Sequence, residues 1–462
     1  MAILPDISAA EFQTGAPIDN PFFPLPPGTI FSYGGTQVDD ETGEAVFERN
    51  DLFVTFETKE IAGVTATVVR DTEYADGLLV EDTLDWYAQD TEGNIWYLGE
   101  LTYAFEYDDA GNFVETSTEG SWTAGVDGAQ AGTIMPADPG FGAAYYQEFA
   151  PGVAEDEAIV VGVDEEVAIG LGEFNGVLQT LDTTALEPDM AEYKYYAPGV
   201  GLVLEEALDE EGEVEFANEL LGVRAVGPDG VDQGNEGDAN GVTLSDLIER
   251  EPFDLDGAEE PEADDFLGDG SGLHVTFLGG EAGLSNALGA YSFDAETGEI
   301  GEGRILFADT ADLAAGTTAS VEVADSEGLG LFLVPNGPDL GLDLSAFADG
   351  GLFFTNLLTG EAATLGDGLA PLVTDGDEVL PVTALHALDG DSDDGFNFLN
   401  PAAGIHAVEL GLPGIDETVA VLGFEDTRVT DPAWDGDFND VLVGVGSAPL
   451  APELAGADPL LV

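Results

Sequence analysis

The sequence predicts an all-β protein, with an antiparallel barrel or strongly curled sheet followed by a β-sandwich. Short segments in which apolar and polar residues alternate recur between residues 29 and 226, a pattern typical of half-buried strands. Turn dipeptides such as Asp76-Gly77 and Pro198-Gly199 separate them, as expected between antiparallel neighbours. A second series of apolar segments begins near residue 273, after an acidic stretch rich in glycine. The chain therefore contains two β-rich domains.

The order of these patterns divides the chain into five segments. The first carries Pro24, Pro26 and Pro27. Proline is excluded from central strands because it lacks a backbone N–H, so we expect this leader to lie extended. The segments are an extended leader at 1–28, an antiparallel β-domain at 29–226, an acidic linker at 227–272, a β-sandwich at 273–446 and a C-terminal tail at 447–462.

Strands of the first β-domain are expected where β-branched and aromatic residues concentrate. We expect paired rings such as Trp86-Tyr87 and Trp96-Tyr97 to form core and cross-strand contacts, the alternative being that they line a ligand cavity. One short helix is predicted in the linker at 244–250, with Thr243 as its N-cap. The predicted strands are 47–56, 64–69, 78–87, 95–97, 158–161, 177–181, 193–196 and 201–204.

The charge balance is the most unusual property of the composition. The chain has 95 Asp and Glu residues but only 8 Lys and Arg residues, for a net charge of −87 at pH 7. Such a chain repels nucleic acid and anionic membranes, so neither is an expected partner. Repulsion among the carboxylates should weaken folding in dilute buffer, where screening is poor. Salt or divalent cations should restore it.

The absence of cysteine, of a membrane-spanning segment and of a basic N-terminus excludes further classes of site and of location. The chain has no cysteine, which excludes disulfides, thiolate zinc sites and cysteine nucleophiles. No apolar run reaches the length of a membrane span, so membrane insertion is not expected. The first basic residue is Arg49, so the N-terminus lacks the charged start of a secretory signal. We expect export by a route that reads the C-terminus; the alternatives are an intracellular protein or a signal removed beforehand.

The stretch from Gly423 to Val445 carries the strongest chemical signal. It crowds acidic and amide side chains into a loop between apolar strands expected at 419–422 and 441–443. Carboxylates held close together repel, and calcium accepts six to eight oxygen ligands in a flexible geometry, whereas magnesium demands a stricter octahedron. The alternative is a solvated acidic turn. The predicted calcium ligands are Glu425, Asp426, Asp435, Asp437, Asn439 and Asp440.

Five motifs follow one another in the second half. They are His274-Val275-Thr276-Phe277, residues 282–289, residues 330–337, Asn400-Pro401 with His406, and Gly423-Phe424-Glu425-Asp426 with Asp437-Phe438-Asn439-Asp440. In this order they resemble an uncharacterised domain family of bacterial secreted and surface proteins. The resemblance implies a β-sandwich with a calcium-binding closing loop, and so favours calcium over the solvated turn.

A departure from that family concerns a second ligand loop. Where the family often has Asp-Gly after Asn-Pro, this chain has Ala402-Ala403. Asp389, Asp391 and Asp393 lie just upstream, and their alternate spacing resembles the start of an EF-hand loop, although the twelfth position is Asn400 rather than glutamate. We predict a second calcium site at these three aspartates, with a solvated acidic loop as the alternative.

The first half has a resemblance of its own. In residues 85–90, 135–137 and 193–200 it is similar to a domain of uncharacterised bacterial exported proteins. That resemblance implies export but no activity.

Catalytic signatures are missing from the sequence. His274, His386 and His406 have no zinc-like spacing, and we expect them in the core or at strand ends. Ser271 and Ser285 lack the full Gly-x-Ser-x-Gly elbow. Paired carboxylates are uninformative in a chain with 95 acids. We predict that the protein is not an enzyme.

These observations predict a secreted, calcium-stabilised structural or adhesive protein of the bacterial cell surface or extracellular matrix. We expect self-association into a homo-oligomer or filament, because a leader carrying Phe12, Phe22 and Phe23 is suited to lie along a neighbouring sheet. Surface glycans are a further expected partner. The alternatives are a carbohydrate-active enzyme or sugar-binding module, and an intracellular protein of a halophile.

Overall fold

The computed structural model describes residues 2–38, 43, 45–108, 110–209, 211–226, 244–249, 261–268, 270, 272–388, 396–410, 419–428, 434, 436 and 438–450. Within these residues the protein is all-β, as predicted. Its one described α-helix, α1 (Leu244–Leu247), has four residues. The chain divides into two compact units, Met1–Ala104 with Ser117–Arg250 and Phe105–Thr116 with Glu251–Val462. In the described part of the chain, no helix is long and apolar enough to cross a membrane.

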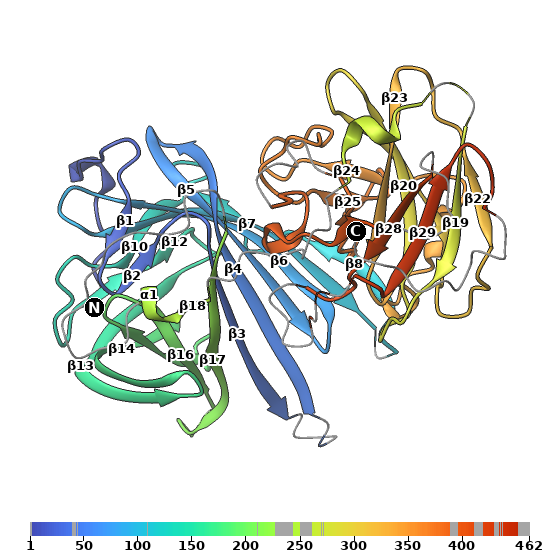
Figure 1. Ribbon diagram of the computed structural model, residues 1–462. Helices are drawn as coiled ribbons and strands as arrows, with labels where there is room; N and C mark the ends of the chain where they lie inside the picture. The colour runs from blue at the N-terminus through green and yellow to red at the C-terminus, as the bar shows by residue number, and fades with distance from the viewer. Residues whose placement is uncertain are drawn as a thin grey trace. The chain divides into compact units, whose positions relative to one another are not determined.

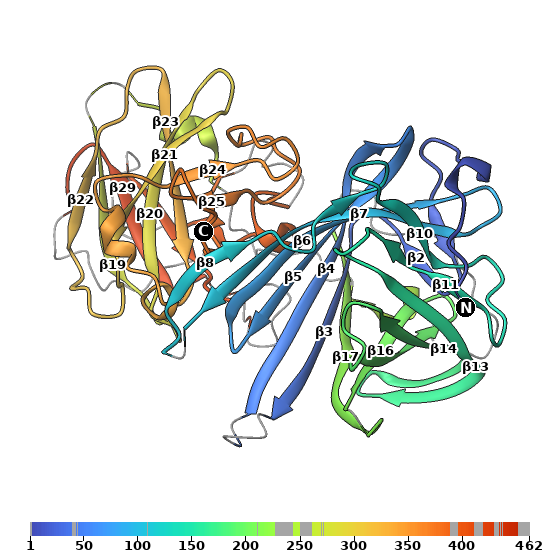
Figure 2. The same ribbon diagram turned by 180° about the vertical axis from the view of Figure 1, so that it is seen from behind.

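One antiparallel sheet forms most of the first unit and curls into a nearly closed barrel (Figures 1 and 2). Its order is β11-β13-β14-β15-β16-β17-β3-β4-β5-β6-β7-β10-β12. The two ends approach each other, because β10 contacts β11 and β12 contacts β13. The strands are β3 (Thr29–Val38), β4 (Ala45–Ile61), β5 (Val64–Ala75), β6 (Leu78–Gln89), β7 (Ile95–Tyr107), β10 (Gln130–Met135), β11 (Ala144–Tyr146), β12 (Glu148–Phe149), β13 (Asp156–Ile169), β14 (Gly172–Thr184), β15 (Ala191–Ala197), β16 (Gly201–Leu208) and β17 (Val214–Ala225), with β8 (Phe113–Ser117) and β9 (Trp122–Thr123) paired to β7.

The predicted aromatic pairs lie in the core of this unit. Trp86, Tyr87, Trp96 and Tyr97 are all buried. The rings of Tyr87 and Tyr97 stack with their centroids 4.8 Å apart, across the β6–β7 pair in which these two residues face each other. Core and cross-strand packing is therefore the role that the structure gives these rings.

The leader packs on the sheet of its own unit. It contains a short 3-10 helix, η1 (Ile7–Ala9), and a hairpin of β1 (Ile18–Asn20) and β2 (Phe23–Leu25). The side-chain amide of Asn20 donates hydrogen bonds to the carbonyls of Gly93 (2.9 Å) and Pro136 (3.2 Å). The ring of Phe23 packs edge-on against Tyr87, with centroids 5.4 Å apart. Phe23, which we expected against a neighbouring copy, thus has a partner within its own unit.

The helix predicted at 244–250 is shorter than expected. It ends at Leu247, and the chain continues as β18 (Ile248–Glu249), which pairs in parallel with β17 through Val223 and Arg224. The pairing of β16 with β17 stops at Glu219, so the edge of β17 beyond it offers backbone hydrogen bonds. Strand pairing therefore replaces the last helical turn, an instance of tertiary context overriding local propensity.

The second unit is a β-sandwich, also as predicted. A five-stranded sheet has the order β22-β19-β29-β28-β27 and a four-stranded sheet the order β21-β20-β23-β26. Phe277 of one sheet packs against Phe307 of the other, with ring centroids 6.5 Å apart. The strands are β19 (Leu273–Gly279), β20 (Ala287–Asp294), β21 (Ile300–Phe307), β22 (Thr318–Val321), β23 (Glu327–Val334), β26 (Leu385–His386), β27 (Ala407–Glu409), β28 (Ala420–Phe424) and β29 (Val441–Gly446), with a separate pair β24 (Phe353–Thr355) and β25 (Leu372–Thr374) and the 3-10 helices η2 (Ala263–Phe266), η3 (Gly337–Asp339), η4 (Leu344–Phe347) and η5 (Pro401–Ala403).

Candidate functional site

Three carboxylates gather at one end of the β28–β29 pair in the second unit. Glu425 and Asp426 directly follow β28, and Asp440 directly precedes β29; Phe424 and Val441 are register partners. One carboxylate oxygen from each of the three residues lies within 4.8 Å of the others. Glu425 and Asp426 are 1% and 3% exposed, so these charges meet in a largely dry position.

Neutral donors and backbone groups orient the three carboxylates. The side-chain amide of Asn286 donates to Asp426 Oδ2 (2.7 Å), and the backbone N–H of Asp426 donates to Asp440 Oδ2 (2.9 Å). The hydroxyl of Thr427 donates to Glu425 Oε1 (2.6 Å). Hydrogen bonds of this kind fix the orientation of metal-binding carboxylates in known sites.

Two glycines allow the backbone of residues 438–440 to reach this position. A Cβ on Gly423 would lie 2.2 Å from the carbonyl oxygen of Phe438, and a Cβ on Gly280 would lie 1.9 Å from that of Asp440. Both distances are far inside van der Waals contact. Glycine is therefore required at position 423 of the Gly423-Phe424-Glu425-Asp426 motif, because the backbone of Phe438 lies too close to it for a side chain.

Three of the other motifs of the second half converge here as well, through Asn286, Asn336 and His406. The backbone N–H of Asn336 donates to Asn286 Oδ1 (3.2 Å), and the backbone N–H of Glu425 donates to the carbonyl of His406 (3.0 Å). His406 is fully buried, and burial together with the nearby positive charge of Arg428 lowers its pKa to about 4. His406 is thus a neutral structural element beside the carboxylates.

The donor set fits calcium. Two oxygens bound to one calcium ion at about 2.4 Å are at most about 4.8 Å apart, which is the limit that these three carboxylates satisfy. All the grouped atoms are carboxylate oxygens, the hard donors that calcium prefers over the nitrogen and sulfur donors typical of zinc. Glu425, Asp426 and Asp440 would hold the ion, whose charge would offset their mutual repulsion.

The predicted ligands divide into those brought together and those outside the described residues. Glu425, Asp426 and Asp440 are brought together. The backbone carbonyl of Asn439 accepts a hydrogen bond from Glu281 (3.0 Å). Asp435 and Asp437, and Asp389, Asp391 and Asp393 of the second predicted loop, lie outside the described residues.

Sequence reasoning missed the part that Asn286 plays in this site. Asn286 lies 140 residues before Asp426 in the chain and is completely buried. It belongs to one of the five motifs, and a buried asparagine inside a motif was the available signal. Its contact with Asp426 depends on the sandwich packing the sheet that contains β20 against the sheet that contains β28, which no local pattern reveals.

The concave interior of the first unit holds a second set of carboxylates. The hydroxyl of Tyr97 lies 2.5 Å from Asp85 Oδ1 and 2.8 Å from Glu100 Oε2. Burial, with the charge of Glu100, raises the pKa of Asp85 to about 8. Burial also raises the pKa of Glu100 to about 7. The interior therefore favours the protonated form of acids that are normally ionised.

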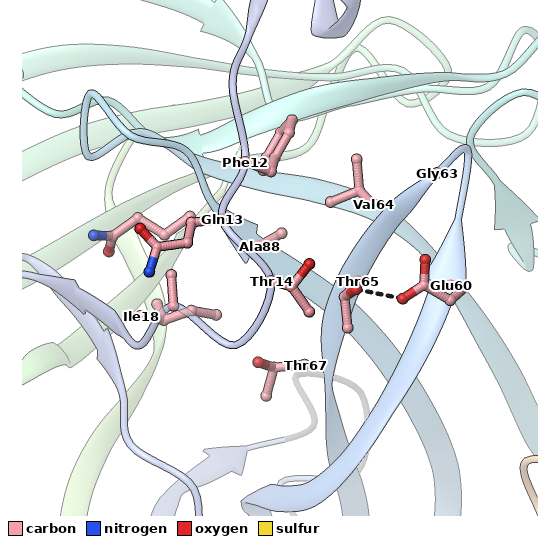
Figure 3. A pocket seen from close by; sticks show the side chains of 12 residues that line it. Phe12, Gln13, Thr14, Ile18, Glu60, Gly63, Val64, Thr65, Thr67 and Ala88 are labelled. Carbon is pink, nitrogen blue, oxygen red and sulfur yellow. Dashed lines mark hydrogen bonds between the residues drawn. The ribbon is translucent and has the colours of Figure 1, made fainter.

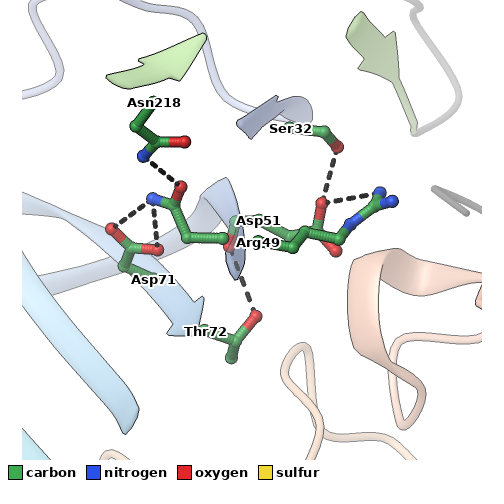
Figure 4. A network of polar contacts seen from close by, with 7 residues as sticks. Ser32, Arg49, Asp51, Asp71, Thr72 and Asn218 are labelled. Atoms are coloured by element: carbon green, nitrogen blue, oxygen red, sulfur yellow. Dashed lines mark hydrogen bonds and ion pairs between the residues drawn. The ribbon is translucent and has the colours of Figure 1, made fainter. Parts of the chain in front are cut away.

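Two side-chain amides link β17, β4 and β5 in the same interior (Figure 4). The amide of Asn218 donates to Asn50 Oδ1 (3.2 Å), and the amide of Asn50 donates to Asp71 (3.2 Å and 3.3 Å). A separate group in the figure joins Asp51 to the hydroxyl of Ser32 (2.6 Å) and the guanidinium of Arg49 (3.2 Å). Half-buried and buried polar residues thus lie on β17, β3, β4 and β5 of the barrel.

A small pocket lies between the leader and the β4–β5 hairpin (Figure 3). Its volume is about 240 Å³, and its lining includes Phe12, Thr14 and Thr67. Gln89, also in the lining, already accepts from the backbone N–H groups of Asp19 (2.8 Å) and Asn20 (3.0 Å) and donates to Asp19 Oδ1 (2.6 Å). The amide of Gln89 therefore holds the leader in place rather than a ligand.

Comparison with known proteins gives little further guidance. No protein family profile matches the chain, and no curated protein matches it. A Bacteroides fragilis structure, described as an exported protein with a YmcC-like fold, is 16% identical with a TM-score of 0.25, covering 44% of this chain and 98% of its own. A lipoprotein from Parabacteroides distasonis is 13% identical with a TM-score of 0.23, covering 44% and 97%. Similarity this low supports no conclusion about family or function.

Proposed function

We propose that the second unit is a calcium-binding β-sandwich and that the protein is a calcium-stabilised structural or adhesive component of the bacterial cell surface or extracellular matrix. The observation that carries the proposal is the convergence of Glu425, Asp426 and Asp440, with oxygens within 4.8 Å in a largely buried position. Each pair of like charges at about 4 Å costs about 4 kcal/mol near a protein surface. A divalent cation offsets that cost.

The position of the site favours a structural role for the ion. It joins the end of β28 to the start of β29, and hydrogen bonds tie it to Asn286 before β20 and to His406 before β27. Calcium would therefore lock several strands of the sandwich together. Extracellular calcium modules commonly bind with dissociation constants of about 10⁻⁴ to 10⁻³ M, a range suited to a protein that matures outside the cell.

We propose a non-catalytic role for the chain. His386 and His406 are fully buried, and burial lowers the pKa of His386 to about 3, so neither is placed to exchange protons with a substrate near neutral pH.

Surface glycans and further copies of the chain are the proposed partners. Calcium would reduce the repulsion between acidic surfaces that such contacts have to overcome.

Thermal unfolding of the full chain with calcium and with chelator tests the calcium proposal. At one hundred times its dissociation constant, the ion adds about 2.7 kcal/mol, which raises the melting temperature of the second unit by roughly 5–10 °C. Asp426→Asn and Asp440→Asn should each remove most of this increase. Equal melting of the unsubstituted chain in calcium and in chelator would contradict the proposal.

Asp312→Asn is the matched control, because Asp312 is an exposed aspartate of the same unit. It should retain the full response to calcium. Sodium at equal ionic strength separates specific binding from screening of the chain's charge. A sodium response as large as the calcium response would mean that the acidity is a general salt adaptation, and would refute a specific site.

A further inference from the structure

The pocket between the leader and the β4–β5 hairpin combines a buried apolar floor with a polar rim (Figure 3). Ile18, Val64 and Ala88 of the lining are buried, whereas Gln13 and Thr14 are exposed. The volume of about 240 Å³ equals that of about eight water molecules. The pocket is therefore open to solvent at its rim and has room for one small ligand.

Contacts within the first unit hold both walls of the pocket in place. On the leader side, Phe12 forms a backbone bridge with Asp90, and its ring packs edge-on against Trp96 with the centroids 6.1 Å apart. On the hairpin side, Ala62 and Gly63 have φ values of 51° and 85°, as in the two-residue turns that join antiparallel strands tightly. A pocket with fixed walls loses little entropy when a ligand binds.

Several polar groups of the lining are free to bind a ligand. Within the described part of the chain, the side chains of Gln13, Thr14 and Thr67 form no hydrogen bond. The hydroxyl of Thr65 donates to the carboxylate of Glu60, which retains lone pairs for further donors. The pocket therefore offers hydroxyl, amide and carboxylate groups around its apolar floor.

The charge of the lining favours a neutral ligand. None of the described residues that line the pocket is basic, and the ammonium of Lys59 lies 3.6 Å from the centroid of the Trp86 ring, outside the lining. An anionic ligand would meet no positive charge there, and Glu60 would repel it. Hydroxyl groups both donate and accept hydrogen bonds, so a compact neutral molecule with several hydroxyls and an apolar C–H surface matches both parts of the pocket.

We propose that this pocket binds a single neutral sugar residue at the end of a surface glycan, with the sugar hydroxyls facing Thr14, Thr67 and Glu60 and its C–H surface facing Phe12. The inference rests on the proposal that surface glycans are partners of this protein. It does not rest on the calcium site, which belongs to the other unit.

Saturation-transfer NMR titrations of the full chain with free monosaccharides, at physiological salt and with calcium present, test the proposal. The probes are D-glucose, D-galactose, D-mannose and L-rhamnose. We expect saturable binding of at least one of them with a dissociation constant of about 1 mM, a typical affinity for a ligand of about a dozen non-hydrogen atoms. The charged uronic acid related to that sugar should bind at least tenfold more weakly.

Substitutions at two threonines test whether the sugar occupies this pocket. Thr14→Phe fills the pocket from its exposed rim, and Thr67→Val removes a hydroxyl at nearly constant volume. Each should weaken binding about tenfold, while circular dichroism checks that the variant folds. Thr183 is an exposed threonine of the same unit outside the lining, so Thr183→Phe and Thr183→Val are the matched controls and should bind as the unsubstituted chain does.

Three results would overturn the inference. They are the absence of saturable binding by all four sugars, equal weakening by the Thr14 and Thr183 substitutions, and a uronic acid that binds as tightly as the neutral sugar. A longer glycan that binds the full chain and is unaffected by Thr14→Phe would also overturn it, but would leave the proposed glycan partner in place. The melting response to calcium is a separate measurement, so none of these results decides the calcium proposal.

Discussion

At the scale of single residues, Tyr97 shows why buried acids in this protein retain protons. Its hydroxyl carries one hydrogen but lies 2.5 Å from Asp85 and 2.8 Å from Glu100. The hydroxyl can donate its hydrogen to only one of the two carboxyl groups. The other short contact is a hydrogen bond only if that carboxyl group is protonated and donates to the hydroxyl oxygen. Burial and the charge of Glu100 raise the pKa of Asp85 to about 8, compared with about 3.9 in an unfolded chain.

Stability of the first unit should therefore fall as the pH rises. Between about pH 4 and pH 8, the folded state keeps a proton on Asp85 that the unfolded state releases, so the free energy of unfolding decreases across this window and levels off above it. Asp85→Asn keeps the group neutral at every pH. We expect this variant to melt close to the unsubstituted chain at pH 5 and roughly 5 °C higher at pH 9.

Melting curves from pH 5 to pH 9, recorded with chelator so that calcium does not contribute, measure this effect. Asp189→Asn, at an exposed aspartate of the same unit, should follow the unsubstituted chain throughout. An Asp85→Asn curve parallel to that of the unsubstituted chain would show that Asp85 is ionised in the folded state, against our interpretation.

At the scale of elements, Gly423 allows β28 to lie against residues 438–440, which follow the acidic loop. A Cβ at this position would lie 2.2 Å from the Phe438 carbonyl and 2.7 Å from Leu410 Cδ1. We expect Gly423→Ala to destabilise the second unit by about 2 kcal/mol, as overpacking of a filled site does, and to weaken calcium binding because it displaces residues 438–440.

Gly283→Ala is the control for this substitution. Gly283 is exposed and an added Cβ there would contact no atom within 4 Å, so its melting temperature and calcium response should be unchanged. If Gly423→Ala also left the melting temperature and the calcium response unchanged, the position of residues 438–440 would not depend on the close contact at Gly423.

The sequence predicts the centres of elements better than their ends. Residues 47–56 were expected as a strand, whereas β4 runs from Ala45 to Ile61, because pairing with β5 continues along polar residues such as Lys59 and Glu60 that periodicity leaves out. β3 was missed altogether. It contains Gly34 and Gly35, which weaken a strand signal, yet a Cβ on Gly35 would lie 2.0 Å from the Ala217 carbonyl of the neighbouring strand.

The same limit applies to the candidate site. Glu425, Asp426 and Asp440 could be predicted together because they are close in sequence and flanked by apolar strands. The contribution of Asn286 could not, because it comes from 140 residues away. The pairing of Asp85 and Glu100 with the Tyr97 hydroxyl could not be predicted either, since 95 acids hide the few that the barrel turns inward.

At the scale of the whole molecule, the net charge of −87 has few internal counter-charges. Three of the 8 basic residues pair with carboxylates of the first unit: Arg49 with Asp51 (3.2 Å), Arg70 with Asp82 (2.6 Å), and Lys194 with three carboxylates. The remaining acids repel one another over distances that depend on the screening length, about 30 Å at 0.01 M salt and about 8 Å at 0.15 M.

We expect the melting temperature in chelator to rise as sodium chloride increases from about 0.01 M to about 0.15 M, because the shorter screening length weakens this repulsion. Differential scanning calorimetry measures the rise. Potassium chloride is the control and should act equally, since screening depends on ionic strength rather than on the ion. A melting temperature independent of salt would mean that repulsion does not limit stability.

Crystallographic location of calcium is the most direct test of the central claim, that Glu425, Asp426 and Asp440 bind this ion. Anomalous scattering from crystals grown in calcium should place an ion at about 2.3–2.6 Å from an oxygen of each of the three carboxylates. Crystals of Asp440→Asn should lack that peak. The claim is contradicted if the unsubstituted protein, saturated with calcium, shows no ion there and the guanidinium of Arg428 occupies the space between the carboxylates instead.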